Sequence, residues 1–162
     1  MSNAQEHLEK AIQIDPKFAD AHYELALILK NKKDYKESKK HFLKSINILP
    51  DFSEAHFNYA LLLKEMKDYK ISKEHFEKAI DLDQDFADAY YHYGLLLVEL
   101  EDFEEAKSNL EKTTDIDQNY KLAYFHLAKL LIGPEDYEKA KKNYLTAIDI
   151  DKDFTDAHYY LG

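Results

Sequence analysis

The chain has 162 residues and a net charge of −10; 45% of its residues are hydrophobic, 33% are charged, and it contains only three Gly and three Pro. This composition is typical of a helical protein, and the acidic charge makes nucleic acid and anionic membranes poor partners. The absence of Cys excludes disulfides and thiolate metal sites. The absence of Arg removes the planar fork that binds phosphate and carboxylate.

A sequence pattern recurs every 34 residues along the chain. Aromatic residues mark it at Phe18, Phe52, Phe86, Tyr120 and Phe154. Alanines mark it at Ala21, Ala55, Ala89, Ala123 and Ala157. A fixed period of this length predicts a solenoid, in which each unit buries its apolar face against its neighbours.

The phase of the pattern divides the chain into repeats. Residues 4–14 match only the second helix of a unit, and residues 155–162 match only the first. The full repeats lie between them, over residues 19–52, 53–86, 87–120 and 121–154. We therefore predict one repeat domain over residues 1–162, cut from a longer array.

Each full repeat is predicted to hold two helices separated by a polar break. In the first repeat, Ala21, Leu25 and Leu29 share one stripe at helical spacing. Second helices are expected to begin near Tyr35, Tyr69, Phe103 and Tyr137. The preceding residues are predicted N-caps, namely Asp34, Asp68, Asp102 and Asp136, and Glu37 and Glu105 extend two of them to capping boxes. In the fourth repeat, Gly133 before Pro134 is expected to end the first helix with a left-handed cap.

This pattern resembles the tetratricopeptide repeat. The family's spacing of bulky and small residues is present in Tyr90-x-x-Tyr93-Gly94-x-x-Leu97 and in Tyr124-x-x-Leu127-Ala128-x-x-Leu131. His22 and His56 replace the family's aromatic residue. Its Gly before the second helix is replaced in turn by Lys33, Lys67, Glu101 and Glu135. The resemblance implies an all-α, right-handed superhelical solenoid of antiparallel helix pairs.

The polar residues do not form a pattern typical of an enzyme or a metal site. His22, His56 and His158 share one repeat column and His7, His41 and His75 share another, which indicates repeat packing or surface positions. The carboxylates fall in turns, caps and solvated faces, and no Gly-rich phosphate loop is present. We expect no catalytic residues, no metal and no cofactor.

The resemblance implies that the first helices line a concave groove, and it assigns a stripe of residues to that groove. The predicted peptide-binding residues are Asp20, Tyr23, Leu27, Glu54, Phe57, Leu61, Asp88, Tyr91, Leu95 and Phe125. Together they would form an aromatic and leucine floor with an acidic margin. The alternative is that the aromatic rings only pack along the helices.

The sequence thus predicts a protein-interaction scaffold whose groove binds an apolar or basic peptide or helix, and not an enzyme. Two alternatives stay open: a structural array that associates head to tail, and the recognition arm of a larger enzyme. No signal-peptide pattern or membrane-spanning run is present, so a cytoplasmic location is expected.

Overall fold

The computed structural model describes residues 3–131 and 133–161, and all regular structure in these ranges is helical. The helices are α1 (Asn3–Ile14), α2 (Ala19–Asn31), α3 (Tyr35–Ile48), α4 (Ser53–Glu65), α5 (Tyr69–Leu82), α6 (Ala87–Glu99), α7 (Phe103–Ile116), α8 (Lys121–Leu130), the 3₁₀ turn η1 (Pro134–Asp136), α9 (Tyr137–Ile150) and α10 (Thr155–Leu161).

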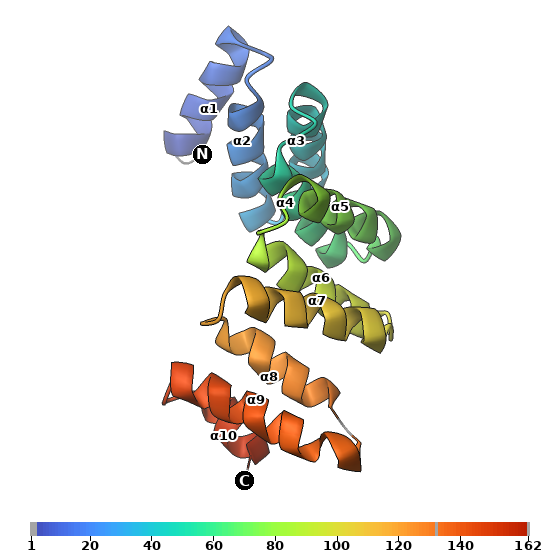
Figure 1. Ribbon diagram of the computed structural model, residues 1–162. Coiled ribbons are helices and arrows are strands. Elements are labelled where there is room, and N and C mark those ends of the chain that lie inside the picture. The colour runs from blue at the N-terminus through green and yellow to red at the C-terminus, as the bar shows by residue number, and fades with distance from the viewer. Residues whose placement is uncertain (1–2, 132, 162) are drawn as a thin grey trace. The chain divides into compact units, whose positions relative to one another are not determined.

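The chain forms two compact units, the first ending at Gln84 and the second beginning at Asp85. Unit 1 contains α1 to α5, and unit 2 contains α6 to α10 (Figure 1). In unit 1, α2 packs on α3 and α4 on α5; in unit 2, α6 packs on α7 and α8 on α9. The single repeat domain over residues 1–162 and its repeat boundaries stay predictions.

The second helices begin at the four predicted aromatic residues, but only two of the four predicted caps form. Asp34 Oδ1 accepts a hydrogen bond from the backbone N–H of Glu37 at 3.3 Å, and Asp102 Oδ1 accepts one from Glu105 at 3.4 Å. Asp68 makes no such bond, and the prediction is wrong there. It is also wrong at Asp136, because that residue already has right-handed helical dihedrals at the end of η1.

Three of the turns between paired helices keep the left-handed backbone that favours Gly, although these three contain no Gly. Lys33, Lys67 and Glu101 have φ of 62°, 62° and 63°. Gly133 instead has φ −80° and ψ 152°, so the predicted left-handed cap is wrong. The residue before a proline is restricted to extended conformations, and Gly133 precedes Pro134.

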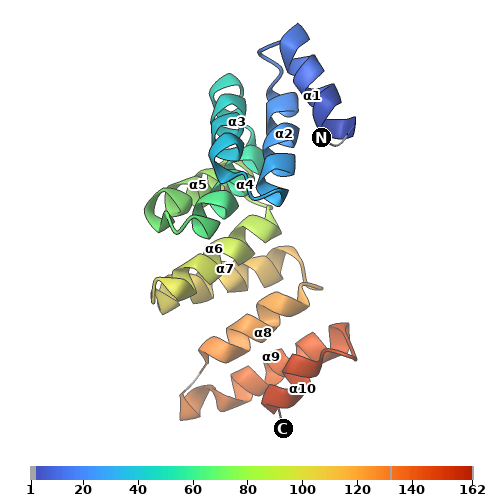
Figure 2. The same cartoon turned by 180° about the vertical axis from the view of Figure 1, so that it is seen from behind.

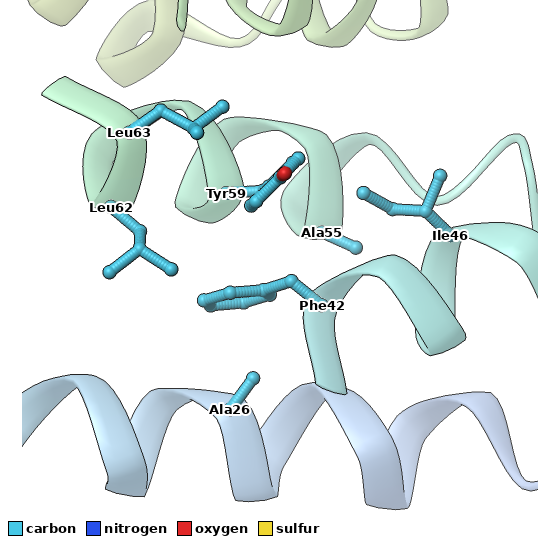
Figure 3. Close-up of a cluster of buried hydrophobic side chains, with 7 residues drawn as sticks. All are labelled: Ala26, Phe42, Ile46, Ala55, Tyr59, Leu62 and Leu63. Carbon is cyan, nitrogen blue, oxygen red and sulfur yellow. The ribbon is translucent and has the colours of Figure 1, made fainter. Parts of the chain in front are cut away.

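Each unit has its own apolar core. In unit 1, Phe42 of α3 lies between α2 and α4 (Figure 3). The cluster consists of Ala26, Phe42, Ile46, Ala55, Tyr59, Leu62 and Leu63. Small residues are needed where two helices approach closely: a Cβ added to Gly94 would lie 3.0 Å from Leu110 Cγ.

The helix pairs of unit 1 are also joined by buried polar contacts. Ser38 and Ser72 donate hydrogen bonds of 2.8 Å to the carbonyl oxygens of Ala26 and Ala60. The two His columns meet here, because His22 Nδ1 lies 2.9 Å from His41 Nδ1. His56 and His75 form the same contact at 2.9 Å.

The partners of the His rings fix the direction of these bonds. His22 Nε2 lies 3.2 Å from the carbonyl oxygen of Pro16, which can only accept, so Nε2 carries the proton and Nδ1 is the acceptor. His41 therefore donates from its own Nδ1. Both rings are neutral in this arrangement, and burial lowers the pKa of His41 to about 4, with smaller contributions from His22 and Lys44.

Candidate interaction surface

The predicted stripe of unit 1 is part core and part surface. Tyr23 of α2 is half-buried, and its ring centroid lies 4.9 Å from that of Phe52. Its hydroxyl accepts a 3.0 Å hydrogen bond from Asn58 Nδ2. Burial, with Glu24 and Glu54 nearby, raises the pKa of Tyr23 to about 12.

Phe57 of α4 is more deeply placed, at 9% exposure, with its ring centroid 6.1 Å from that of Phe76. The aromatic rings of unit 1 therefore stabilise the contacts within the unit, as the packing alternative expected. Their predicted role in binding a peptide stays a prediction.

The accessible part of this surface is acidic, and it includes Glu24, which the predicted stripe did not contain. Asp20 and Glu24 of α2 and Glu54 of α4 are exposed, and Leu27 and Leu61 are half-buried beside them on the same helix faces. We call these five residues the acidic face. It offers carboxylates to solvent together with two leucine side chains that a ligand can still cover.

In unit 2 the residues at the equivalent positions are more involved in contacts within the protein itself. Tyr91 is 5% exposed and its ring centroid lies 4.8 Å from that of Tyr120. The Tyr120 hydroxyl donates a 2.7 Å hydrogen bond to Asp88 Oδ1. Burial and the Asp88 carboxylate raise the pKa of Tyr120. Leu95 is half-buried and packs on the same cluster.

Phe125 lies within a group of rings at the end of unit 2. It is 6% exposed, with ring centroids of Phe154 and Tyr160 at 5.2 Å and 5.7 Å. The ammonium of Lys129 lies 5.4 Å from the Phe125 centroid. The first-helix face of unit 2 is thus less acidic than that of unit 1.

The sequence did not identify the residues that pack against the predicted aromatic residues Tyr23 and Tyr91. Phe52 packs against Tyr23, and Tyr120 packs against Tyr91. In the sequence, Phe52 and Tyr120 had been used only as markers of the repeat. The two sets of aromatic residues recur at the same interval, and this was the signal of their contact that the sequence offered. A packing role follows from it once each turn is placed against the first helix before it.

Two features, a cluster of metal ligands and a helix that could span a membrane, have no candidate among the described residues. Within residues 3–131 and 133–161, no three side chains of His, Cys, Asp or Glu are grouped to hold a metal ion. None of the helices described is long and apolar enough to span a membrane.

Comparisons with known families agree with the repeat pattern. Models of the tetratricopeptide repeat match residues 19–52, 53–86, 75–108 and 122–154, and a TPR-repeat model matches residues 2–33. None of the curated proteins matches the sequence significantly.

Solved structures show the same fold at low identity. The crystal structure of MamA superposes with a TM-score of 0.83 at 19% identity, covering 91% of this chain and 86% of that one. YrrB, described as a TPR protein with an unusual peptide-binding site, gives 0.78 at 23%, covering 96% and 80%. The first TPR of Spaghetti (RPAP3), bound to the HSP90 peptide SRMEEVD, gives 0.67 at 21%, covering 69% and 89%. The fold is therefore an all-α tetratricopeptide solenoid.

Proposed function

Because this chain belongs to the tetratricopeptide-repeat family, we propose that it is a protein-interaction scaffold whose acidic face binds a basic segment of a partner protein. Of the structural neighbours, YrrB is described as having a peptide-binding site, and the first TPR of Spaghetti is described as bound to a peptide. These descriptions support a peptide as the ligand class. The partner segment would be extended or helical, and it would bring lysines or arginines with one or two apolar side chains. Neither a catalytic activity nor a cofactor is part of this proposal.

The observation that carries the proposal is the composition of the acidic face. Asp20, Glu24 and Glu54 are exposed, and none of them forms an ion pair with a Lys among the described residues. Unpaired carboxylates attract a basic segment and raise its association rate. Leu27 and Leu61 supply apolar area, at roughly 25 cal/mol per Å² covered.

The other predicted site residues contribute through the shape of this surface. The rings of Tyr23 and Phe57 pack inside unit 1 and so fix the positions of α2 and α4, which carry the acidic face. Asp88, Tyr91, Leu95 and Phe125 occupy the equivalent positions of unit 2, and we propose that they form a corresponding binding surface on that unit. A cytoplasmic location stays a prediction.

The test is a fluorescence anisotropy titration with a labelled peptide in which two leucines are spaced between lysines. The variant Asp20→Lys with Glu54→Lys should weaken binding by about a hundredfold at low salt, because each reversal removes an attraction and adds a repulsion. Both residues are exposed, but they lie in the first turns of α2 and α4, where a cation is less favourable, so circular dichroism must verify that the variant is folded.

A matched control reverses two exposed carboxylates elsewhere in unit 1, with Asp51→Lys and Asp81→Lys. This variant has the same net charge and should bind the peptide nearly as well as the unmodified chain. Equal losses in the two variants would show that only net charge matters and would contradict the proposal.

Self-association is a second candidate function, favoured by exposed rings at one end of unit 2. Tyr159 of α10 is 79% exposed and Tyr137 of α9 is 61% exposed, and Ile14 of α1 in unit 1 is 87% exposed. Sedimentation velocity over a wide concentration range should show association that Tyr159→Lys weakens. A monomer at every concentration would exclude this function.

A further inference from the structure

A cleft of about 460 Å³ lies in unit 2 where α7, α8 and α9 meet. Helix α8 lies between α7 and α9 in both ribbon views (Figures 1 and 2). The floor of the cleft is apolar and includes Leu127 and Leu131. These leucines follow Phe125 and Lys129 by two residues, about 200° around the helix, so the cleft faces away from the first-helix stripe.

The rim of this cleft is basic. Lys107 of α7 and Lys139 and Lys142 of α9 line it, and Glu111 lies on the same rim. Lys139 forms an exposed ion pair with Asp136, with Nζ and Oδ1 3.6 Å apart. In the part of the chain that the structure describes, neither Lys107 nor Lys142 is paired with a carboxylate. We call this site the lysine cleft.

The charge is not uniform along the lysine cleft. Tyr124 lies at its other end, where burial raises the pKa of the phenol and Asp115 and Asp117 raise it further. Negative charge is therefore grouped near the start of α8. Lys107 and Lys139 lie at the opposite end, in the first halves of α7 and α9.

The same three-helix cleft occurs in unit 1 with no Lys among its lining residues, although Lys32 and Lys40 bond to two of those residues, Gln5 and Glu37. It has about 400 Å³ between α1, α2 and α3, and its positions precede those of the lysine cleft by three repeat lengths. Gln5 and Glu37 stand there in place of Lys107 and Lys139. The repeat fold therefore supplies the cleft, and the side chains of unit 2 make it basic.

We propose that the lysine cleft binds an acidic segment of a partner protein that carries one aliphatic side chain. Its carboxylates would lie against Lys107, Lys139 and Lys142, and its aliphatic group would cover the leucine floor. On a chain of net charge −10, three grouped ammonium ions, two of them without a carboxylate partner among the described residues, are a local exception that complements a negative ligand. Lysine acts as a point charge and imposes no fixed carboxylate geometry, which suits a flexible segment.

The experiment is an anisotropy titration of the whole chain with a labelled peptide that has one leucine between pairs of glutamates. The test variant, Lys107→Gln with Lys139→Glu, gives the lysine cleft the unit 1 residues at these two positions. The dissociation constant should rise by about tenfold or more. Glu in the first turn of a helix is favourable, so α9 should form normally.

The matched control makes the same change of charge at exposed positions of α3 and α5, with Lys36→Gln and Lys70→Glu. It should change the dissociation constant by about twofold at most, because neither lysine lines the cleft. Equal weakening in both variants, or no saturable binding by the unmodified chain at low salt, would overturn the proposal.

Two further arms identify the ligand. A peptide with Ser in place of its leucine should bind more weakly, and equal binding would contradict a role for the apolar floor. Inorganic phosphate should displace the peptide no better than chloride at the same ionic strength. Stronger displacement by phosphate would show a site for a simple anion and would overturn the peptide assignment.

Discussion

The two units join their helix pairs by different chemistry on the same backbone plan. In unit 1, Ser72 donates a buried hydrogen bond across the α4–α5 pair, and His56 contacts His75 across the same pair. In unit 2 the positions equivalent to His56 and His75 are Tyr90 and Asn109 in one pair and Tyr124 and Asn143 in the next. Alanines, Ala106 and Ala140, stand where unit 1 has Ser38 and Ser72.

This difference shows which parts of the repeat are fixed and which are free. The close approach of the paired helices is common to both units, since Ala60 is fully buried and Gly94 has no room for an unhindered Cβ. The buried Ser hydrogen bonds and His–His contacts of unit 1, which we call the Ser joints and His joints, can be replaced by apolar and amide groups. The His joints also make the stability of unit 1 sensitive to acid, because they require neutral rings.

The largest effect is expected from enlarging the shared close approach. Ala60→Leu should lower the free energy of unfolding by roughly 1–3 kcal/mol, because the added atoms must enter the contact between α4 and α5. Thermal unfolding followed by circular dichroism measures this loss. The control Lys70→Leu adds the same side chain at an exposed position and should have little effect. An unchanged midpoint in Ala60→Leu would mean that the packing face is misassigned.

The second effect is the acid sensitivity of unit 1. Burial lowers the pKa of His41 and His75 to about 4, and it also lowers the pKa of His22 and His56. The unfolded chain therefore binds more protons, and stability that is complete above the ordinary pKa of 6.5 is lost as the pH falls toward 4. Between neutral pH and about pH 5 the loss should be on the order of 1 kcal/mol per pair.

Burial sets the direction of this effect, and the groups around the His pairs add to it or oppose it. Lys44 and Lys40 lower the pKa of His41, and Glu37 opposes them. Lys78 lowers the pKa of His56, where the carbonyl of Pro50 acts in the opposite sense. Tyr59 presents its ring edge-on to His75, with centroids 4.7 Å apart.

Exchange of the joints between units sharpens this test. The variant with the unit 2 residues, His22→Tyr, His41→Asn, His56→Tyr and His75→Asn, should lose most of the extra destabilisation at pH 5. Chemical unfolding at both pH values measures it, and the four remaining His residues are the same in both proteins. A variant that keeps the full pH dependence would show that other groups cause it.

A third, smaller effect tests the left-handed turns. Lys67→Gly should raise the free energy of unfolding by about 1 kcal/mol, because Gly adopts a φ of 62° without the steric cost that a side chain imposes. Glu135→Gly, at the equivalent position in the fourth repeat, should give no gain because that position lies within η1. A gain at both positions would point to a cause other than the backbone angle.

The smallest effect concerns the Ser joints. Ser72→Ala should lower the free energy of unfolding by about 0.5–1 kcal/mol through loss of the bond to the Ala60 carbonyl. Unit 2 already has Ala at the equivalent Ala106, so the fold should be retained. A loss of several kcal/mol would show that the polar joint cannot be replaced.

Much of the fold could be predicted from the sequence because the repeat encodes it locally. The starts of α3, α5, α7 and α9 follow from the aromatic residues after each Asp. The missing caps and the extended Gly133 depend on backbone angles that the next residues impose. Periodicity alone could not supply those angles.

The sites were less accessible to sequence reasoning. The column of Tyr23 and Phe57 is apolar at helical spacing, which fits a binding floor and a packed core equally well. Burial distinguishes the two, and it depends on the turn residue Phe52. Nothing in the sequence distinguishes Lys107, Lys139 and Lys142 from other surface lysines. They form a rim only where three helices meet.

The proposed function is tested most directly by titrating the leucine and lysine peptide against the unmodified chain and the Asp20→Lys, Glu54→Lys variant in parallel. The proposal predicts saturable binding by the unmodified chain and a loss of about a hundredfold in the variant, with little change in the Asp51→Lys, Asp81→Lys control. Equal affinity for all three proteins would contradict the assignment of the acidic face as the binding surface.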